Sequence, residues 1–230
     1  MMTPLRAFIA IEIPPSIQQA IHANTADLRR ALGPNWVKWV PAQNLHLTLK
    51  FLGDISSANV PLLSDMLTTE ATRLAPFPLR VSGLGSFPNP KRARVIWLGL
   101  HAPAALTALV RGIEAACVRL GYEAEERPFS PHLTIGRVKQ PIPAEAQSAV
   151  ASALERTQIG DLGVATVDAL HLFKSDLKPS GAVYTKIFSA PLQPIIARSE
   201  TTKQSPTSQQ GLLTALRAAQ VSSGKAPFSQ

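Results

Sequence analysis

The chain has 230 residues, of which 45% are hydrophobic and 17% are charged. This balance excludes wholesale disorder, because disordered chains are poorer in apolar residues and richer in charge. No stretch approaches the roughly 18 apolar residues of a membrane helix, and the apolar start, residues 7–13, contains Glu12 and runs into Pro14. We therefore predict a folded protein without a membrane span or a signal peptide.

The charge favours an anionic partner. Lys and Arg number 23 against 15 Asp and Glu, which gives a net charge of +8, and a basic surface attracts polyanions such as nucleic acid. The last segment, residues 195–230, is rich in Ser, Thr and Gln and carries +3 of this charge. Its composition predicts a disordered tail after a folded domain at residues 1–194. That domain lacks a long basic run, which favours a local anion site.

The only cysteine, Cys117, has no second cysteine with which to form a disulfide or a thiolate metal cage. We expect a reduced residue in the apolar core and a cytoplasmic location.

Strand-like and helix-like stretches alternate along the chain. In the first half we predict a strand at 5–13, one helix from 15 to 32, strands at 36–40 and 45–52, a helix at 57–74, and strands at 79–84 and 93–100. The second half resembles the first, with a helix at 103–120, a strand at 130–138, a helix at 143–156, and strands at 163–173 and 182–189.

A short internal repeat carries the chemistry. His46-Leu47-Thr48-Leu49 recurs 86 residues later as His132-Leu133-Thr134-Ile135, each time in a predicted strand. Because side chains alternate along a strand, each copy places an imidazole and a hydroxyl on one face and two apolar side chains on the other. If the two halves pack as pseudo-symmetric lobes, the two polar faces meet at one ligand.

Two imidazoles and two hydroxyls suit phosphodiester cleavage. The pKa of histidine, near ~6.5, allows one copy to act as a base and the other as an acid, while threonine hydroxyls bind phosphate oxygens. Zinc is the competing hypothesis, but the chain has no His-Glu-x-x-His motif and no carboxylate within either copy. Glycine-rich nucleotide-binding loops are also absent, so we expect neither a metal nor another cofactor.

Neighbouring residues have two interpretations each. Lys50 should share the face of His46, as an added positive charge or as a solvated lysine. Phe51 should fall on the apolar face and pack in the core, although an aromatic ring there could stack on a base, and Phe129 is balanced between these roles. His171 lies in a strand that could approach the site. His22 and His101 should be solvated or structural.

At these residues the chain resembles the two-histidine phosphoesterase superfamily, and within it the bacterial and archaeal RNA 2′,3′-cyclic phosphodiesterases, historically called 2′-5′ RNA ligases. The resemblance covers residues 5–192 and includes RAFIAIEIP, VKWVPAQNLHLTLKFLGDI, RVIWLGL, RPFSPHLTIGRVK and LFKSDLKPSGAVYTKI. It implies a bilobed α+β fold, in which each lobe is a small antiparallel sheet with helices outside, and an active site in the groove between the lobes.

The resemblance also implies roles for the site residues. His46 would donate a proton to the leaving oxygen, His132 would activate water, and Thr48 and Thr134 would hold the phosphate. The residues themselves leave the acid and base interchangeable. Arg137 matches a phosphate-binding arginine of the family; strict alternation would turn it away, unless Gly136 relaxes the strand, and otherwise it is a surface charge.

The reaction implied is hydrolysis of a terminal 2′,3′-cyclic phosphate on RNA to a 2′-phosphomonoester. We expect the enzyme to be a monomer. Three alternatives stay open: a non-catalytic protein that binds RNA ends, the reverse ligation through a 2′,5′ linkage, and hydrolysis of a small cyclic phosphate. Both His-Thr pairs are intact, which argues against the binding protein.

Overall fold

The computed structural model describes residues 4–179 and 181–193, so the predicted tail at 195–230 lies outside the described residues. The chain forms two antiparallel sheets. Sheet A has the order β3 (His46–Ile55), β1 (Leu5–Glu12), β8 (Ala169–Lys178) and β9 (Gly181–Pro191). Sheet B has the order β2 (Val37–Trp39), β6 (His132–Val138), β5 (Val95–His101), β4 (Phe77–Phe87) and β7 (Asp161–Val167).

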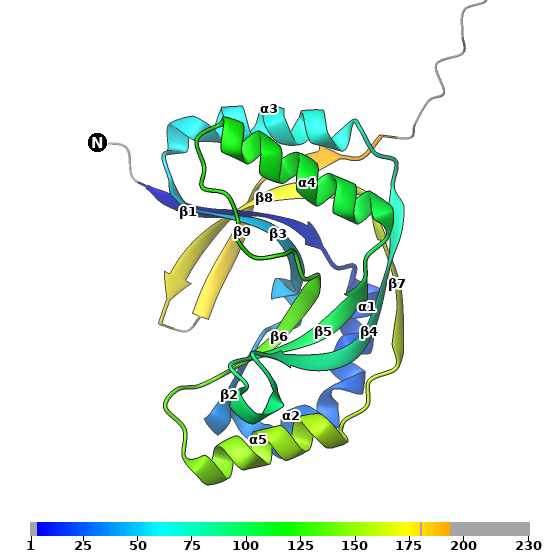
Figure 1. Cartoon of the computed structure of the whole chain (residues 1–230), viewed down its shortest axis with the longest axis vertical. Helices are drawn as coiled ribbons and strands as arrows, with labels where there is room; N and C mark the ends of the chain where they lie inside the picture. Colours follow the sequence, from blue (N-terminus) through cyan, green and yellow to red (C-terminus); the bar gives the residue numbers. More distant parts are fainter. Residues whose placement is uncertain (1–3, 180, 194–230) are drawn as a thin grey trace, which may run out of the picture. The chain divides into compact units, whose positions relative to one another are not determined.

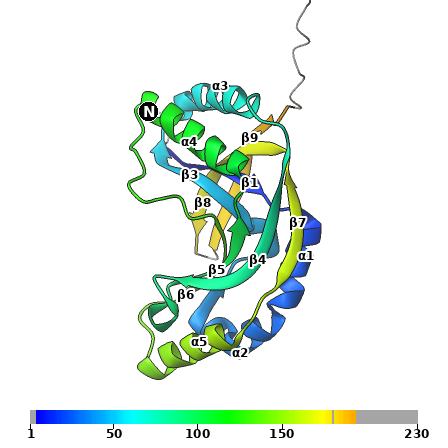
Figure 2. The same ribbon diagram turned by 45° about the vertical axis from the view of Figure 1, so that its right-hand side comes forward.

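Helices cover one side of each sheet (Figures 1 and 2). Sheet A contacts α3 (Val60–Ala71) and α4 (Ala104–Arg119). Sheet B contacts α1 (Pro15–Asn24), α2 (Ala26–Trp36) and α5 (Ala144–Arg156). Short 3₁₀ turns lie at Ala42–Asn44, Ser57–Asn59 and Pro90–Arg92, and the last of these is η3. The α+β fold with two sheet-and-helix lobes is thus confirmed.

The lobes do not coincide with the two halves of the sequence. The chain leaves sheet A after β1 to build α1 and α2 on sheet B, and it leaves sheet B after β5 to build α4 on sheet A. Sheet A is completed by β8 and β9 from the end of the chain. Each lobe therefore contains strands from both halves of the chain, and the two His-Thr strands lie in different sheets.

Two predicted elements are split. The predicted helix over 15–32 is interrupted at Thr25, a buried residue with φ −101° whose hydroxyl donates to the carbonyl of Ile21 at 2.7 Å. A threonine that bonds its own preceding turn competes with regular helix geometry. The predicted strand over 163–173 is two strands, because the chain changes from sheet B to sheet A at Asp168. Periodicity within one segment does not show which sheet it joins.

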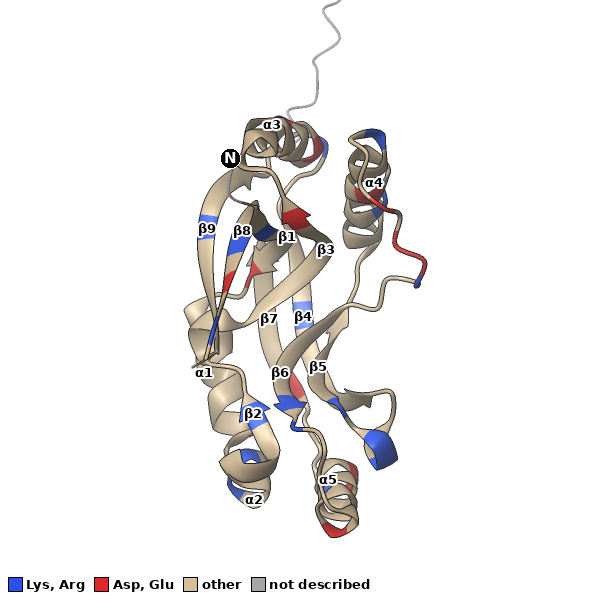
Figure 3. Cartoon of the chain, turned by 90° about the vertical axis from the view of Figure 1, so that its left-hand side faces the viewer, with Lys and Arg blue, Asp and Glu red and all other residues tan. Residues whose placement is uncertain are grey.

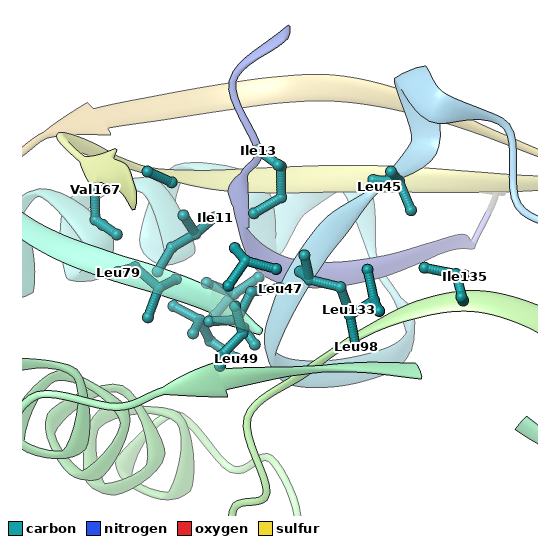
Figure 4. Close-up of a cluster of buried hydrophobic side chains, with 14 of the residues drawn as sticks. Ile11, Ile13, Leu45, Leu47, Leu49, Leu79, Leu98, Leu133, Ile135 and Val167 are labelled. Atoms are coloured by element: carbon teal, nitrogen blue, oxygen red, sulfur yellow. The ribbon is translucent and has the colours of Figure 1, made fainter. Parts of the chain in front are cut away.

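One apolar core joins the lobes behind the two His-Thr strands. Figure 4 shows Leu47 and Leu49 of β3 beside Leu98 of β5 and Leu133 of β6. All four are at most 7% exposed. The apolar faces of β3 and β6 thus share this core. Within the described ranges, no helix is long and apolar enough to cross a membrane.

Candidate active site

The two His-Thr strands have the same local structure. Each has an intermediate histidine and threonine separated by a buried leucine, followed by two consecutive buried residues, Leu49-Lys50 in β3 and Ile135-Gly136 in β6. The strand registers explain the double burial. Leu49 has no partner between the Ala10–Thr48 and Ile9–Lys50 pairs, and Ile135 has none between the Trp97–Thr134 and Ile96–Gly136 pairs.

Each extra residue is a β-bulge, which reverses the alternation of side chains beyond it. In β6 the bulge returns Arg137 to the face of Thr134, since Arg137 pairs with Val95, two residues from Trp97. The irregularity lies at Ile135, directly before Gly136, where strict alternation would have turned Arg137 away. The backbone of the strand also packs tightly, because a Cβ on Gly136 would lie 2.8 Å from Val37 and 2.9 Å from Trp39.

In β3 the same bulge overturns two expectations. Lys50 does not share the face of His46 but is buried, with 6% exposure. Phe51 is not in the core: it is 62% exposed, and its ring lies 6.2 Å from that of Phe8, which in turn lies 4.8 Å from the ring of His46. An aromatic ring is thus presented to solvent beside the first histidine.

Buried Lys50 holds the loop that leads to the second motif. Its ammonium donates to Glu114 Oε1 at 2.9 Å and to the carbonyl of Glu123 at 2.6 Å. The same Glu114 oxygen accepts from the backbone N–H of Glu125 at 2.7 Å. Because a buried charge needs both a counter-charge and hydrogen bonds, these contacts fix residues 123–125 against β3 and α4.

The two imidazoles are oriented identically. Nδ1 of His46 lies 2.7 Å from the carbonyl oxygen of Asn44, and Nδ1 of His132 lies 2.7 Å from that of Ser130. A carbonyl only accepts, so each Nδ1 carries the proton and donates it. Each Nε2 is then left to accept a proton when the ring is neutral and to donate one when it is charged.

Aromatic side chains enclose His46. Its ring meets Tyr184 edge-on at 5.1 Å and an interplanar angle of 89°, and it lies 6.3 Å from Phe173. Phe8 stacks on Phe173 at 5.2 Å. Burial lowers the pKa of His46, the hydrogen bond to the Asn44 carbonyl partly offsets this by raising it, and the positive charge of Arg137 lowers it further. Arg137 of sheet B therefore acts electrostatically on the histidine of sheet A.

His132 has a different setting. Its ring meets Phe87 edge-on at 5.0 Å and lies 6.4 Å from the indole of Trp97. That indole covers Gly85, where any added Cβ would collide with it. The ring of His132 therefore rests on sheet B side chains that pack only because residue 85 is a glycine.

The two polar faces adjoin, since β3 and β6 contact each other across the lobes and the charge of Arg137 on β6 lowers the pKa of His46 on β3. The hydroxyls of Thr48 and Thr134 make no hydrogen bond within the described part of the chain, and both residues are partly exposed. Five predicted site residues, His46, Thr48, His132, Thr134 and Arg137, thus come together on adjoining faces.

A polar row continues from His46 across sheet A. Glu12 is the direct cross-strand partner of His46, and it accepts from Lys186 at 2.6 Å. His171 lies 3.6 Å from Glu12 and shares a hydrogen bond of 2.9 Å with Ser189. His171 thus lies on the face of the site, although it is only 7% exposed. Burial lowers its pKa, against the raising effect of Glu12.

The other candidates lie elsewhere. Phe129 is half-buried against the core, His22 is exposed on α1, and His101 shares a hydrogen bond of 2.8 Å with Ser82. Sequence reasoning assigned no role to Tyr184 and did not single out Phe8, Phe173 or Phe87. Phe8, Phe173 and Tyr184 fell in predicted strands and Phe87 fell outside them, but no pattern in the sequence shows which strands pair, and pairing decides the contacts with the histidines.

Comparison with known proteins identifies the family of the chain. A family model described as LigT-like phosphoesterase matches residues 11–97 and 98–184, one match around each histidine. The RNA 2′,3′-cyclic phosphodiesterase of Methanothermobacter thermautotrophicus is 32% identical over 181 residues, which are 79% of this chain and 95% of that protein. The protein of the same name from Archaeoglobus fulgidus is 32% identical over 180 residues, 78% of this chain and 96% of its own.

Among solved structures, E. coli LigT complexed with 3′-AMP superposes with a TM-score of 0.65 at 27% identity, covering 84% of this chain and 100% of that one. E. coli LigT complexed with phosphate gives a TM-score of 0.60 at 27% identity, covering 83% and 99%. The two family matches, the relatives and the paired histidine motifs agree: this chain belongs to the LigT-like phosphoesterase family, within the two-histidine phosphoesterases.

Proposed function

We propose that the chain hydrolyses 2′,3′-cyclic phosphodiester ends of RNA to 2′-phosphomonoesters, using two imidazoles and no metal ion. The observation that carries the proposal is the matched pair of Nδ1–carbonyl hydrogen bonds, which leaves both Nε2 atoms for a ligand on adjoining faces. The printed names of the relatives, RNA 2′,3′-cyclic phosphodiesterase, support the substrate class.

The proposed step is an in-line displacement at phosphorus. A water oxygen forms a bond to phosphorus as the bond between phosphorus and the 3′-oxygen breaks. The water gives a proton to Nε2 of His132, and Nε2 of His46 gives a proton to the departing 3′-oxygen, which becomes a hydroxyl. Exchange of both protons with solvent restores the starting state.

Three side chains would hold the phosphate. The hydroxyls of Thr48 and Thr134 can donate to non-bridging oxygens, and the guanidinium of Arg137 can neutralise the charge that develops in the transition state. Phe51, exposed beside this group, offers a face on which the terminal base can stack.

The protonation of His46 depends on the ligand. Its lowered pKa disfavours the charged ring in the free protein, whereas a proton donor must carry its proton. A phosphate anion beside Thr48 would raise the pKa of His46 and favour its protonated form, because an opposite charge nearby stabilises the charged imidazole. The proposal therefore predicts that phosphate binding and protonation of His46 are coupled.

We further propose that the chain acts as a monomer in the cytoplasm. The expected location rests on the single cysteine, Cys117, which is free and buried. Burial raises the pKa of its thiol to about 11. Light scattering on the purified chain would test the oligomeric state.

The test is incubation with an RNA oligomer that ends in a 2′,3′-cyclic phosphate, with a chelator present, followed by separation of 2′- and 3′-monophosphate products. A 2′-phosphate product formed at full rate in chelator supports the proposal. Loss of activity in chelator would point to a metal, and a 3′-phosphate would show that the other oxygen leaves. Tight binding without product would identify a protein that binds RNA ends.

A further inference from the structure

Charge is unevenly distributed around the proposed site. On sheet B, Lys38 of β2 is the direct partner of Arg137, so both point to the same face. Lys139 follows two residues after Arg137, roughly 7 Å further along at the usual rise of a strand. Lys38, Arg137 and Lys139 are exposed, and none forms an ion pair within residues 4–179 and 181–193.

More cations adjoin this end of β6. The backbone N–H of Val138 donates to the carbonyl of Arg94 at 2.9 Å, so Arg94 lies beside the last residue of the strand. The 3₁₀ turn η3 just before Arg94 adds two more exposed cations. Together these residues form a surface that we call the basic edge: Lys38, Lys91, Arg92, Arg94 and Lys139.

The other end of β6 has the opposite charge. The loop between α4 and β6 carries three carboxylates and one cation, all exposed: Glu123, Glu125, Glu126 and Arg127. Figure 3 shows this contrast, with Lys and Arg on β2, at the end of β6 and before β5, and with a mainly acidic loop after α4 that ends in one basic residue. The bond that Lys50 donates to the Glu123 carbonyl and the bond that Glu114 accepts from the Glu125 N–H hold residues 123–125 in place, so these two carboxylates are a fixed feature of that side.

We propose that the RNA chain leading to the cyclic phosphate leaves the site over the basic edge, beyond Arg137, and not over the acidic loop. This inference rests on the proposed function and adds a path for the rest of the substrate. A single strand carries one negative charge per nucleotide, so its backbone gains from each cation and is repelled by each carboxylate. Lys38 of the basic edge is the cross-strand partner of Arg137, so the basic edge begins at the proposed phosphate site.

The experiment compares Lys38→Gln/Lys139→Gln with Arg111→Gln/Arg119→Gln. The control removes the same charge from exposed positions on α4. Each protein is assayed on a 2′,3′-cyclic mononucleotide and on an RNA oligomer ending in a 2′,3′-cyclic phosphate, at several salt concentrations. Binding of a fluorescent RNA oligomer is measured in parallel by anisotropy.

We expect the Lys38/Lys139 variant to raise KM and Kd for the oligomer by roughly three- to tenfold at low salt, as two surface charge contacts are lost. The dependence of log Kd on log salt should become shallower by about 1.4, at about 0.7 per contact with single strands. The mononucleotide should be hydrolysed as by the wild type, and the α4 control should match the wild type on both substrates.

Two results would overturn the path. One is an unchanged oligomer Kd in the Lys38/Lys139 variant. The other is an equal loss of oligomer affinity in the α4 control, which would mean that the net charge of the protein, and not the basic edge, determines binding. Failure of the wild type to hydrolyse either substrate would instead remove the proposed function, and the anisotropy series would still decide where RNA binds.

Discussion

The two His-Thr strands keep one geometry and carry different chemistry. Both have the same burial pattern and a bulge three residues after the histidine. Four and five positions after the histidine, β3 has Lys50 and Phe51, whereas β6 has Gly136 and Arg137. In β3, Phe51 exposes an aromatic ring and buried Lys50 binds the loop after α4. In β6, Arg137 provides a guanidinium, and the missing side chain of Gly136 allows β2 to pack closely. The two copies share the same positions and differ in the side chains that fill them.

The largest effect should come from the shared residues. His46→Ala and His132→Ala should each lower kcat by about 10²- to 10⁴-fold on the cyclic RNA end, because each removes one proton transfer. Circular dichroism should show an intact fold in both. His22→Ala, an exposed histidine on α1, is the matched control and should retain full activity. A wild-type rate in either site variant would refute the paired mechanism.

Arg137→Gln should lower kcat/KM by about 10²- to 10³-fold, the usual cost of removing one donor to a developing negative charge. Because Arg137 lowers the pKa of His46, its removal should also move the limb of the pH–rate profile that belongs to His46 to higher pH. Arg137→Lys keeps the charge and should leave that limb in place. An unshifted limb in Arg137→Gln would show that the two groups do not interact.

Lys50→Met tests the buried anchor. Removing it leaves the Glu123 carbonyl without this donor and Glu114 without its counter-charge, with only the Glu125 N–H still donating to that carboxylate. Breaking a largely buried pair costs roughly 3 kcal/mol of unfolding free energy. Lys50→Met/Glu114→Gln should recover part of this loss, since it removes the unpaired charge. Urea unfolding measures both. A single variant as stable as the wild type would mean that the loop does not depend on Lys50.

Phe51→Ala should mainly weaken binding. The ring is 62% exposed, so stability should change little, whereas loss of a stacked base costs about 1–3 kcal/mol and should raise KM for the RNA end at least fivefold. Leu62→Ala, which removes a side chain 56% exposed on α3, is the control. An unchanged KM in Phe51→Ala would show that no base stacks on this ring.

The smallest effect concerns pH and stability. The pKa values of His46 and His171 are lowered by burial, so the unfolded chain binds their protons more readily than the folded one. Stability is then fully present above about pH 6.5, the unfolded value, and falls as the pH drops through the lowered folded values. Urea midpoints at pH 7.5 and 5.5 measure the slope. His171→Asn should make stability depend less on pH. An unchanged dependence in this variant would show that His171 does not contribute to it.

The sequence by itself determined much of the site. The repeated His-x-Thr at strand spacing predicted which residues meet, because alternation is a local property of the backbone. Most helices and strands could also be predicted, since their apolar periodicity and their Pro and Gly boundaries are local. The burial of Cys117 could be predicted as well, because a lone cysteine among apolar residues favours a place in the core.

Only the tertiary structure decided the rest. The positions of Lys50 and Phe51 depend on a bulge, and a bulge is defined by the partner strand, which alternation within one strand does not reveal. The enclosure of His46 by Phe173 and Tyr184 joins residues more than 120 positions apart, and the crossing of α1, α2 and α4 between lobes depends on which sheet offers each helix an apolar face. Local patterns specify which face is apolar, whereas packing selects its partner.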